Sequence, residues 1–149
     1  VVLFPIADHE TSKKFARKLR NEFKPAFLIS IERAGLSQDK IYLDMAGRDI
    51  TAYTAKIDYL FDGQENTLGI GDGGNEIGMG NLAQYIPAVE TLPDNPAVTC
   101  VTRLLLASIS NWGGYGLVAA LSKLTGKNLL PAVDWEKEII RKIIEKGVE

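Results

Sequence analysis

Three acidic side chains stand where buried strands are expected to end, and their chemistry suits proton transfer. Glu32 directly follows the apolar segment 26–31, and Asp72 and Glu76 lie in a glycine-rich turn that follows the apolar segment 67–70. Ligands of open α/β sheets bind beyond the carboxyl ends of the strands, so we expect these carboxylates to converge there. A carboxylate can accept a proton as a general base. We therefore predict that Glu32, Asp72 and Glu76 are the catalytic residues.

The glycine-rich turn, residues 69–80, reads Gly-Ile-Gly-Asp-Gly-Gly-Asn-Glu-Ile-Gly-Met-Gly. Its first, third and sixth residues have the spacing of a dinucleotide-binding turn, in which glycines let the backbone approach a pyrophosphate at a helix N-terminus. However, the next expected strand does not end in the acidic residue of such sites, and Asp72 and Glu76 would repel a phosphate. Tight packing of a strand against a helix is the simpler alternative for these glycines.

A small zwitterion suits this turn better than a nucleotide. Backbone N–H groups at a helix start can hold a carboxylate, and acidic side chains can hold an ammonium group. Arg33 could grip a second carboxylate bidentately, although an ion pair with Glu32 is an equally good interpretation. Asn111 offers a donor and an acceptor, either for an oxyanion or as a turn cap. The predicted substrate-binding residues are Arg33, Gly73, Gly74, Asn75, Ser110 and Asn111.

The same acidic residues could instead bind a metal ion. Mg²⁺ and Mn²⁺ prefer oxygen ligands, which Asp72 and Glu76 would supply. Nothing in the sequence requires a cofactor, so this metal is an option beside direct contact with the substrate. The chain contains one His and one Cys, which excludes Cys-rich and His-rich metal sites.

Composition restricts the remaining function classes. The 149 residues include 17 Lys and Arg against 19 Asp and Glu, and this balance argues against a nucleic-acid or anionic-membrane surface. No apolar stretch approaches the roughly 20 residues that span a bilayer, and the first residues lack the charged start of a signal peptide. With a single cysteine, a reducing compartment is compatible, and we expect a soluble, cytoplasmic protein that acts on a small molecule.

Alternating apolar segments and helical patterns predict the elements that position these residues. The expected strands are residues 1–6, 26–31, 67–70 and 104–107, and the expected helices are 11–23 (capped by Thr11 or Ser12), 51–61, 75–86, 115–124 and 135–146 (capped by Asp134). Residues 32–50 form a long loop, a kind of segment that is usually functional or mobile. We predict one α/β domain over residues 1–149, with a mostly parallel sheet of about four strands flanked by helices in a Rossmann-like, three-layer arrangement.

Three segments resemble a known family. Residues 29–35 (Ile-Ser-Ile-Glu-Arg-Ala-Gly), the glycine-rich turn and residues 110–113 (Ser-Asn-Trp-Gly) are similar, in this order, to the D-glutamate cyclase C-terminal-domain family, formerly a domain of unknown function. The resemblance covers essentially the whole chain and corresponds to the later half of the family's domain. An earlier motif of the family, Thr-Glu-Thr-Asp-Gly-Pro-like, has no counterpart in this sequence.

The resemblance implies a hydro-lyase that dehydrates D-glutamate to 5-oxo-D-proline. Glu32 or Asp72 would then take a proton from the amine. Glu76 would orient the amine or donate a proton to the oxygen that departs as water. Arg33, Asn111 and the amides near Gly73 and Gly74 would stabilise the oxyanion.

Two alternatives stay open beside this enzyme. One is a non-catalytic α/β module that binds a small anionic metabolite or nucleotide. The other is half of a two-chain enzyme, completed by a partner half-domain. An apolar stripe on the last expected helix, residues 139–144, could support a homo-oligomer or could pack on the sheet.

Overall fold

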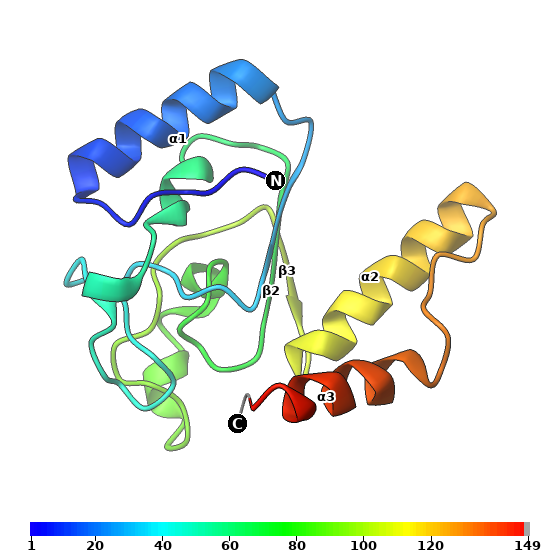
Figure 1. Cartoon of the computed structure of the whole chain (residues 1–149). Helices are drawn as coiled ribbons and strands as arrows, with labels where there is room; N and C mark the ends of the chain where they lie inside the picture. The colour runs from blue at the N-terminus through cyan, green and yellow to red at the C-terminus, as the bar shows by residue number, and fades with distance from the viewer. Residues whose placement is uncertain (148–149) are drawn as a thin grey trace. The chain divides into compact units, whose positions relative to one another are not determined.

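The computed structural model describes residues 1–147, and the chain divides into two compact units (Figure 1). The first unit, Val1–Gly114, contains the whole sheet, and the second begins at Tyr115. The expectation of a single domain over residues 1–149 stays a prediction.

The sheet has three parallel strands, β1 (Leu28–Ile31), β2 (Thr67–Gly71) and β3 (Arg103–Leu106), in the order β1-β2-β3 (Figure 1). All five residues of the central strand are buried, as expected for a strand paired on both edges. Because the strands are parallel, their carboxyl ends meet at one edge of the sheet. The α/β class with a parallel sheet and flanking helices is therefore confirmed, with three strands instead of the expected four.

The missing strand is the one predicted over residues 1–6. This segment is not paired with the sheet, and Phe4 instead packs edge-on against Phe15 with ring centroids 5.1 Å apart. Pro5 has no N–H group to donate to a ladder, which disfavours strand pairing in so short a segment. The strand predicted over residues 1–6 is accordingly wrong, since the apolar side chain of Phe4 packs on the following helix.

That helix, α1 (His9–Phe23), begins two to three residues before the expected caps. Its N-cap is Asp8, whose Oδ1 accepts a hydrogen bond from the Thr11 amide at 2.8 Å. A carboxylate at this position satisfies a backbone donor that no residue within the helix can reach. The last residue of the helix is Phe23, and its C-cap, Lys24, adopts a left-handed conformation directly before Pro25.

Two predicted helices are largely replaced by irregular chain. Residues 51–61 form only two 3₁₀ turns, η1 (Thr51–Tyr53) and η2 (Ile57–Leu60). In place of the helix over residues 75–86 there are η3 (Met79–Leu82) and η4 (Ile86–Ala88). The segment before η3 instead lies beside the end of β1, where Gly35 N–H donates to Asn75 O and Ile77 N–H donates to Arg33 O, both at 2.8 Å. Glycine weakens helices by about 1 kcal/mol relative to alanine, so these pairings prevail locally.

Helix α2 (Ser110–Thr125) starts five residues earlier than expected, and α3 (Trp135–Glu145) matches its prediction closely. The predicted cap of α3, Asp134, makes no capping hydrogen bond with its side chain. Within residues 1–147, no helix is both long and apolar enough to cross a membrane.

Candidate functional site

The structure brings the three predicted catalytic carboxylates together at the carboxyl edge of the sheet. Glu32 follows β1, whereas Asp72 and Glu76 follow β2, and one oxygen from each lies within 4.8 Å of the other two. We call these three residues the carboxylate cluster. Glu32 is exposed, Asp72 is half-buried and Glu76 is 2% exposed. The cluster is thus open to solvent on one side and anchored in the protein on the other.

Glu32 is held at the end of the β1–β2 ladder. Its N–H donates to Ile70 O at 3.0 Å, and its φ of 50° turns the chain out of the strand. Burial raises the pKa of the Glu32 carboxyl, the nearby Ser110 hydroxyl lowers it, and the negative charges of Asp72 and Glu76 raise it further. The net effect is an upward shift, which favours a carboxyl that accepts and holds a proton.

Glu76 folds back on the glycine-rich turn. Its Oε1 accepts hydrogen bonds from the Gly73 amide at 2.7 Å and from the Asp72 amide at 3.1 Å. Its Oε2 is buried and has no hydrogen-bond partner among the described residues. The Gly73 amide, predicted to bind a substrate carboxylate, is therefore occupied by a side chain of the same turn.

The geometry of the turn explains two of its glycines. A Cβ on Gly71 would lie 3.0 Å from Cδ of Glu76, so glycine leaves the space that this carboxylate fills. Gly74 has a φ of 92°, which side-chain-bearing residues rarely adopt, and its carbonyl accepts a hydrogen bond from the Ala97 amide at 3.1 Å. No helix begins at this turn, so the predicted helix N-terminus is absent from it.

Asp72 connects the turn to the start of α2. Its Oδ2 accepts a hydrogen bond from the Ser110 amide at 2.9 Å, which satisfies one free donor of the helix N-terminus. The Ser110 hydroxyl is 1% exposed and lacks a partner within residues 1–147. Asn111 lies next in the first turn of α2 and is exposed. The Ser110 amide thus contacts the carboxylate cluster, and within residues 1–147 Asn111 forms no hydrogen bond with it.

The structure gives Arg33 a partner other than the cluster. Its Nη2 donates to Ala55 O at 3.0 Å, and its buried Nε has no partner among the residues described. Within residues 1–147, Arg33 forms no ion pair with Glu32. The simple ion pair considered from the sequence is therefore not formed.

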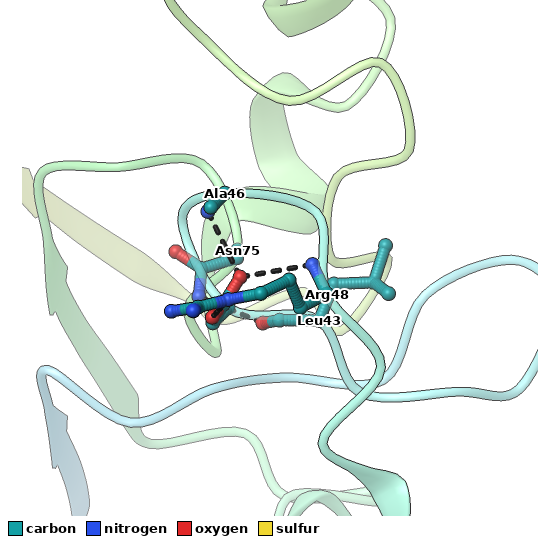
Figure 2. Close-up of polar contacts among 5 residues, drawn as sticks. Leu43, Ala46, Arg48 and Asn75 are labelled. Carbon is teal, nitrogen blue, oxygen red and sulfur yellow. Dashed lines mark hydrogen bonds and ion pairs between the residues drawn. The ribbon is translucent and has the colours of Figure 1, made fainter.

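The side-chain amide nitrogen of Asn75 binds the long loop, residues 32–50, and not the carboxylate cluster. Its Nδ2 donates to Leu43 O at 2.9 Å, and Figure 2 shows this side chain lying against the loop that carries Ala46 and Arg48. Asp44 in the same loop accepts from the amides of Ala46 and Arg48, each at 2.9 Å. These bonds lower the pKa of the Asp44 carboxyl, the Arg48 amide contributing most. The loop is thereby closed on itself and tied to the glycine-rich turn.

A buried polar network below the loop was missed from the sequence. Asp58 is 3% exposed and accepts hydrogen bonds from the Leu36 amide at 2.8 Å, the Tyr42 hydroxyl at 2.6 Å and the Thr99 hydroxyl. Burial raises the pKa of Tyr42 strongly, and the Asp58 charge raises it further, so the phenol stays a hydrogen-bond donor. The available signal was an acidic residue inside the apolar segment 55–61.

This arrangement suits a positively charged group. Three carboxylates and a buried hydroxyl share one edge of the sheet, and no Lys or Arg within the described residues pairs with the cluster. An ammonium group or a cation would therefore be attracted, whereas a phosphate would be repelled. The raised pKa of Glu32 adds a group able to accept a proton from such an ammonium.

Comparison with known proteins gives the site a family context. A family model described as "D-glutamate cyclase-like, C-terminal" matches residues 2–149. The mitochondrial D-glutamate cyclase of Homo sapiens is 32% identical over a match that covers 75% of this chain and 20% of the human protein. The chain thus spans only a small part of this relative's length.

Proposed function

This chain belongs to the D-glutamate cyclase-like C-terminal family, and on that premise we propose that it binds D-glutamate and converts it to 5-oxo-D-proline. One observation carries the proposal: Glu32, Asp72 and Glu76 place their oxygens within 4.8 Å of one another at the carboxyl edge of the sheet. The substrate has an ammonium group for this cluster and a side-chain carboxyl that the amine can attack. Reaction within one molecule needs little beyond correct orientation and proton transfer.

Glu32 is the group best suited to take the proton. Its side chain is exposed to solvent, so a substrate can reach it. Partial desolvation of its carboxyl, together with its acidic neighbours, raises the pKa of Glu32. Asp72 is tied to the Ser110 amide and would orient the ammonium group. Glu76 has one free oxygen, Oε2, which would hold the amine or protonate the departing water.

The reaction balances without an oxidant or reductant. The amine nitrogen forms a bond to the side-chain carboxyl carbon, and one carbon–oxygen bond of that carboxyl breaks. Two protons leave the nitrogen and two join the departing oxygen, which leaves as water. Since the Gly73 amide is bonded to Glu76, we assign stabilisation of the oxyanion to the remaining predicted donors, namely Arg33, Asn111 and the Gly74 amide.

The direct test is incubation of the purified chain with D-glutamate, with 5-oxoproline detected by mass spectrometry. Formation of 5-oxoproline from D-glutamate, in excess of that from L-glutamate, supports the proposal. Binding of D-glutamate without turnover would instead favour a non-catalytic module for a small anionic metabolite.

A second candidate is one half of a two-chain enzyme, in which another polypeptide completes the site. In that case turnover would appear only after a second polypeptide is added. The relative's name assigns that protein to mitochondria, so cytoplasmic localisation of this chain stays a prediction.

A further inference from the structure

The carboxylate cluster carries negative charge that its protein surroundings do not neutralise. Glu32, Asp72 and Glu76 each offer one oxygen within 4.8 Å of the other two, and none of them is ion-paired with Lys, Arg or His in the part of the chain that the structure describes. Like charges at such separations repel, and the repulsion grows where water is excluded. A bound cation would remove this repulsion.

One buried carboxylate oxygen of the cluster has no hydrogen-bond partner among the described residues. Glu76 is fixed by the amides that bond Oε1, and its Oε2 has no donor within residues 1–147. The Ser110 hydroxyl is buried beside the Glu32 carboxyl, to which it can donate, and the Ser110 amide is bonded to Asp72. These side chains are 2% and 1% exposed. Buried polar atoms are nearly always satisfied, so the unpartnered Oε2 of Glu76, beside two further carboxylates, is suited to a cation.

We propose that Glu32, Asp72 and Glu76 bind one hard divalent cation of the Mg²⁺ or Mn²⁺ type, each through one carboxylate oxygen. The donor set is all oxygen, which is what these ions prefer. Oxygens that share one Mg²⁺ lie about 3.0 Å apart when adjacent and about 4.2 Å apart when opposite, because each metal–oxygen bond is near 2.1 Å. Separations up to 4.8 Å therefore require the carboxylates to draw together around the ion, and the exposed Glu32 side chain is free to move inward.

The metal site deepens the proposed function and rests on it for its catalytic meaning. With the cation bound, Oε2 of Glu76 would bind the ion in place of the amine, and the second oxygen of Glu32 would take the proton. D-Glutamate brings two carboxylates toward a cluster of three, and a divalent cation between them would let an acidic substrate approach an acidic site. Water ligands, which Mg²⁺ usually retains, would leave positions for a substrate oxygen. The binding step itself can be measured without any substrate.

The probe is Mn²⁺, titrated into the full chain and followed by electron paramagnetic resonance of the free ion. We expect one Mn²⁺ per chain, with Mg²⁺ competing for the same site. Glu32→Gln and Asp72→Asn should each weaken binding at least tenfold. Glu22→Gln is the matched control, because Glu22 is exposed on α1 and has no ion pair among the described residues. Circular dichroism of each variant shows whether it is folded.

Absence of stoichiometric Mn²⁺ binding at millimolar concentration would overturn the inference, as would binding that neither cluster variant weakens. A different result would contradict the proposed function. A chain that binds Mn²⁺ but forms no 5-oxoproline would keep the metal site and lose the cyclase activity. Turnover that persists in a chain without Mn²⁺ binding, after treatment with a chelator, would keep the activity and remove the metal.

Discussion

The Glu76 carboxylate accepts a hydrogen bond from the Gly73 amide at 2.7 Å, so the glycine-rich turn is closed by its own acidic side chain. The Asp72 amide donates to the same oxygen at 3.1 Å. Glu76 therefore has a structural task in addition to any part in chemistry. This double role separates it from Glu32, which is exposed at the end of β1.

Replacement of Glu76 by Gln should lower stability. A hydrogen bond to a charged acceptor contributes more than one to a neutral acceptor, so we expect Glu76→Gln to lower the free energy of unfolding by about 1–2 kcal/mol. Urea denaturation measures the change, with Glu32→Gln as the comparison variant near wild-type stability. Equal stability of Glu76→Gln and wild type would show that the closing bonds contribute little.

Two adjacent glycines of α2 should respond in opposite directions to alanine. A Cβ on Gly113 would lie 2.5 Å from Cγ2 of Ile70 and 2.7 Å from Cδ2 of Leu105, whereas a Cβ on Gly114 would meet nothing within 4 Å. We expect Gly113→Ala to destabilise the protein by about 1–3 kcal/mol through overpacking. Gly114→Ala should stabilise it by about 0.5–1 kcal/mol, because alanine favours a helix interior.

Thermal and urea unfolding of these two variants provide the measurement, and each serves as the control for the other. The same direction of change for both would contradict the close packing of Gly113 on β2 and β3.

Prediction from the sequence succeeded where a general rule of sheet topology applies. Parallel strands end at a common edge, and this rule alone predicted the convergence of Glu32 with Asp72 and Glu76. The strands that carry them, β1 and β2, were also identified from continuous apolar segments. No side-chain contact had to be known for this part.

Prediction failed where distant residues decide the local conformation. Residues 75–86 have a helical pattern, yet Ile77 N–H donates to Arg33 O, which only the folded chain brings close. The burial of Asp58 follows from three donors in other segments, among them the Tyr42 hydroxyl. The nearby sequence does not identify these partners, and for Asp58 it shows only an acidic residue within the apolar segment 55–61.

The buried bond between Tyr42 and Asp58 should contribute measurably to stability. Tyr42→Phe removes the hydroxyl that donates to Asp58 Oδ2 at 2.6 Å and leaves a buried carboxylate with one donor fewer. We expect a loss of about 1–3 kcal/mol in the free energy of unfolding. Tyr53→Phe is the matched control, since Tyr53 is 82% exposed and should tolerate the change. Similar values for the two variants would contradict the importance of the network.

The closed loop at Asp44 should have a distinct dependence on pH. Hydrogen bonds from the Arg48 amide, followed by the other donors of the loop, lower the folded-state pKa of Asp44 below 3.8. A lowered pKa means that the charged form stabilises the folded state above about pH 4, and that this contribution is lost as the pH falls through the folded value.

Asp44→Asn should therefore be less stable than wild type at pH 7, and the difference should shrink at pH 3 and below. Urea denaturation across this range measures it, and Asp94→Asn, at another exposed acidic position, is the control. A difference that is constant with pH would show that charge on Asp44 does not support the loop.

The central claim is that the carboxylate cluster is the site at which D-glutamate is cyclised, and Glu32 is its most accessible member. The most direct measurement is the rate of 5-oxoproline formation from D-glutamate by the wild-type chain and by Glu32→Gln. We predict turnover by the wild type and a loss of at least about 100-fold in the variant, in the range of general acid–base catalysis. Absence of turnover in the folded wild-type chain, or equal rates for the two proteins, would contradict the account.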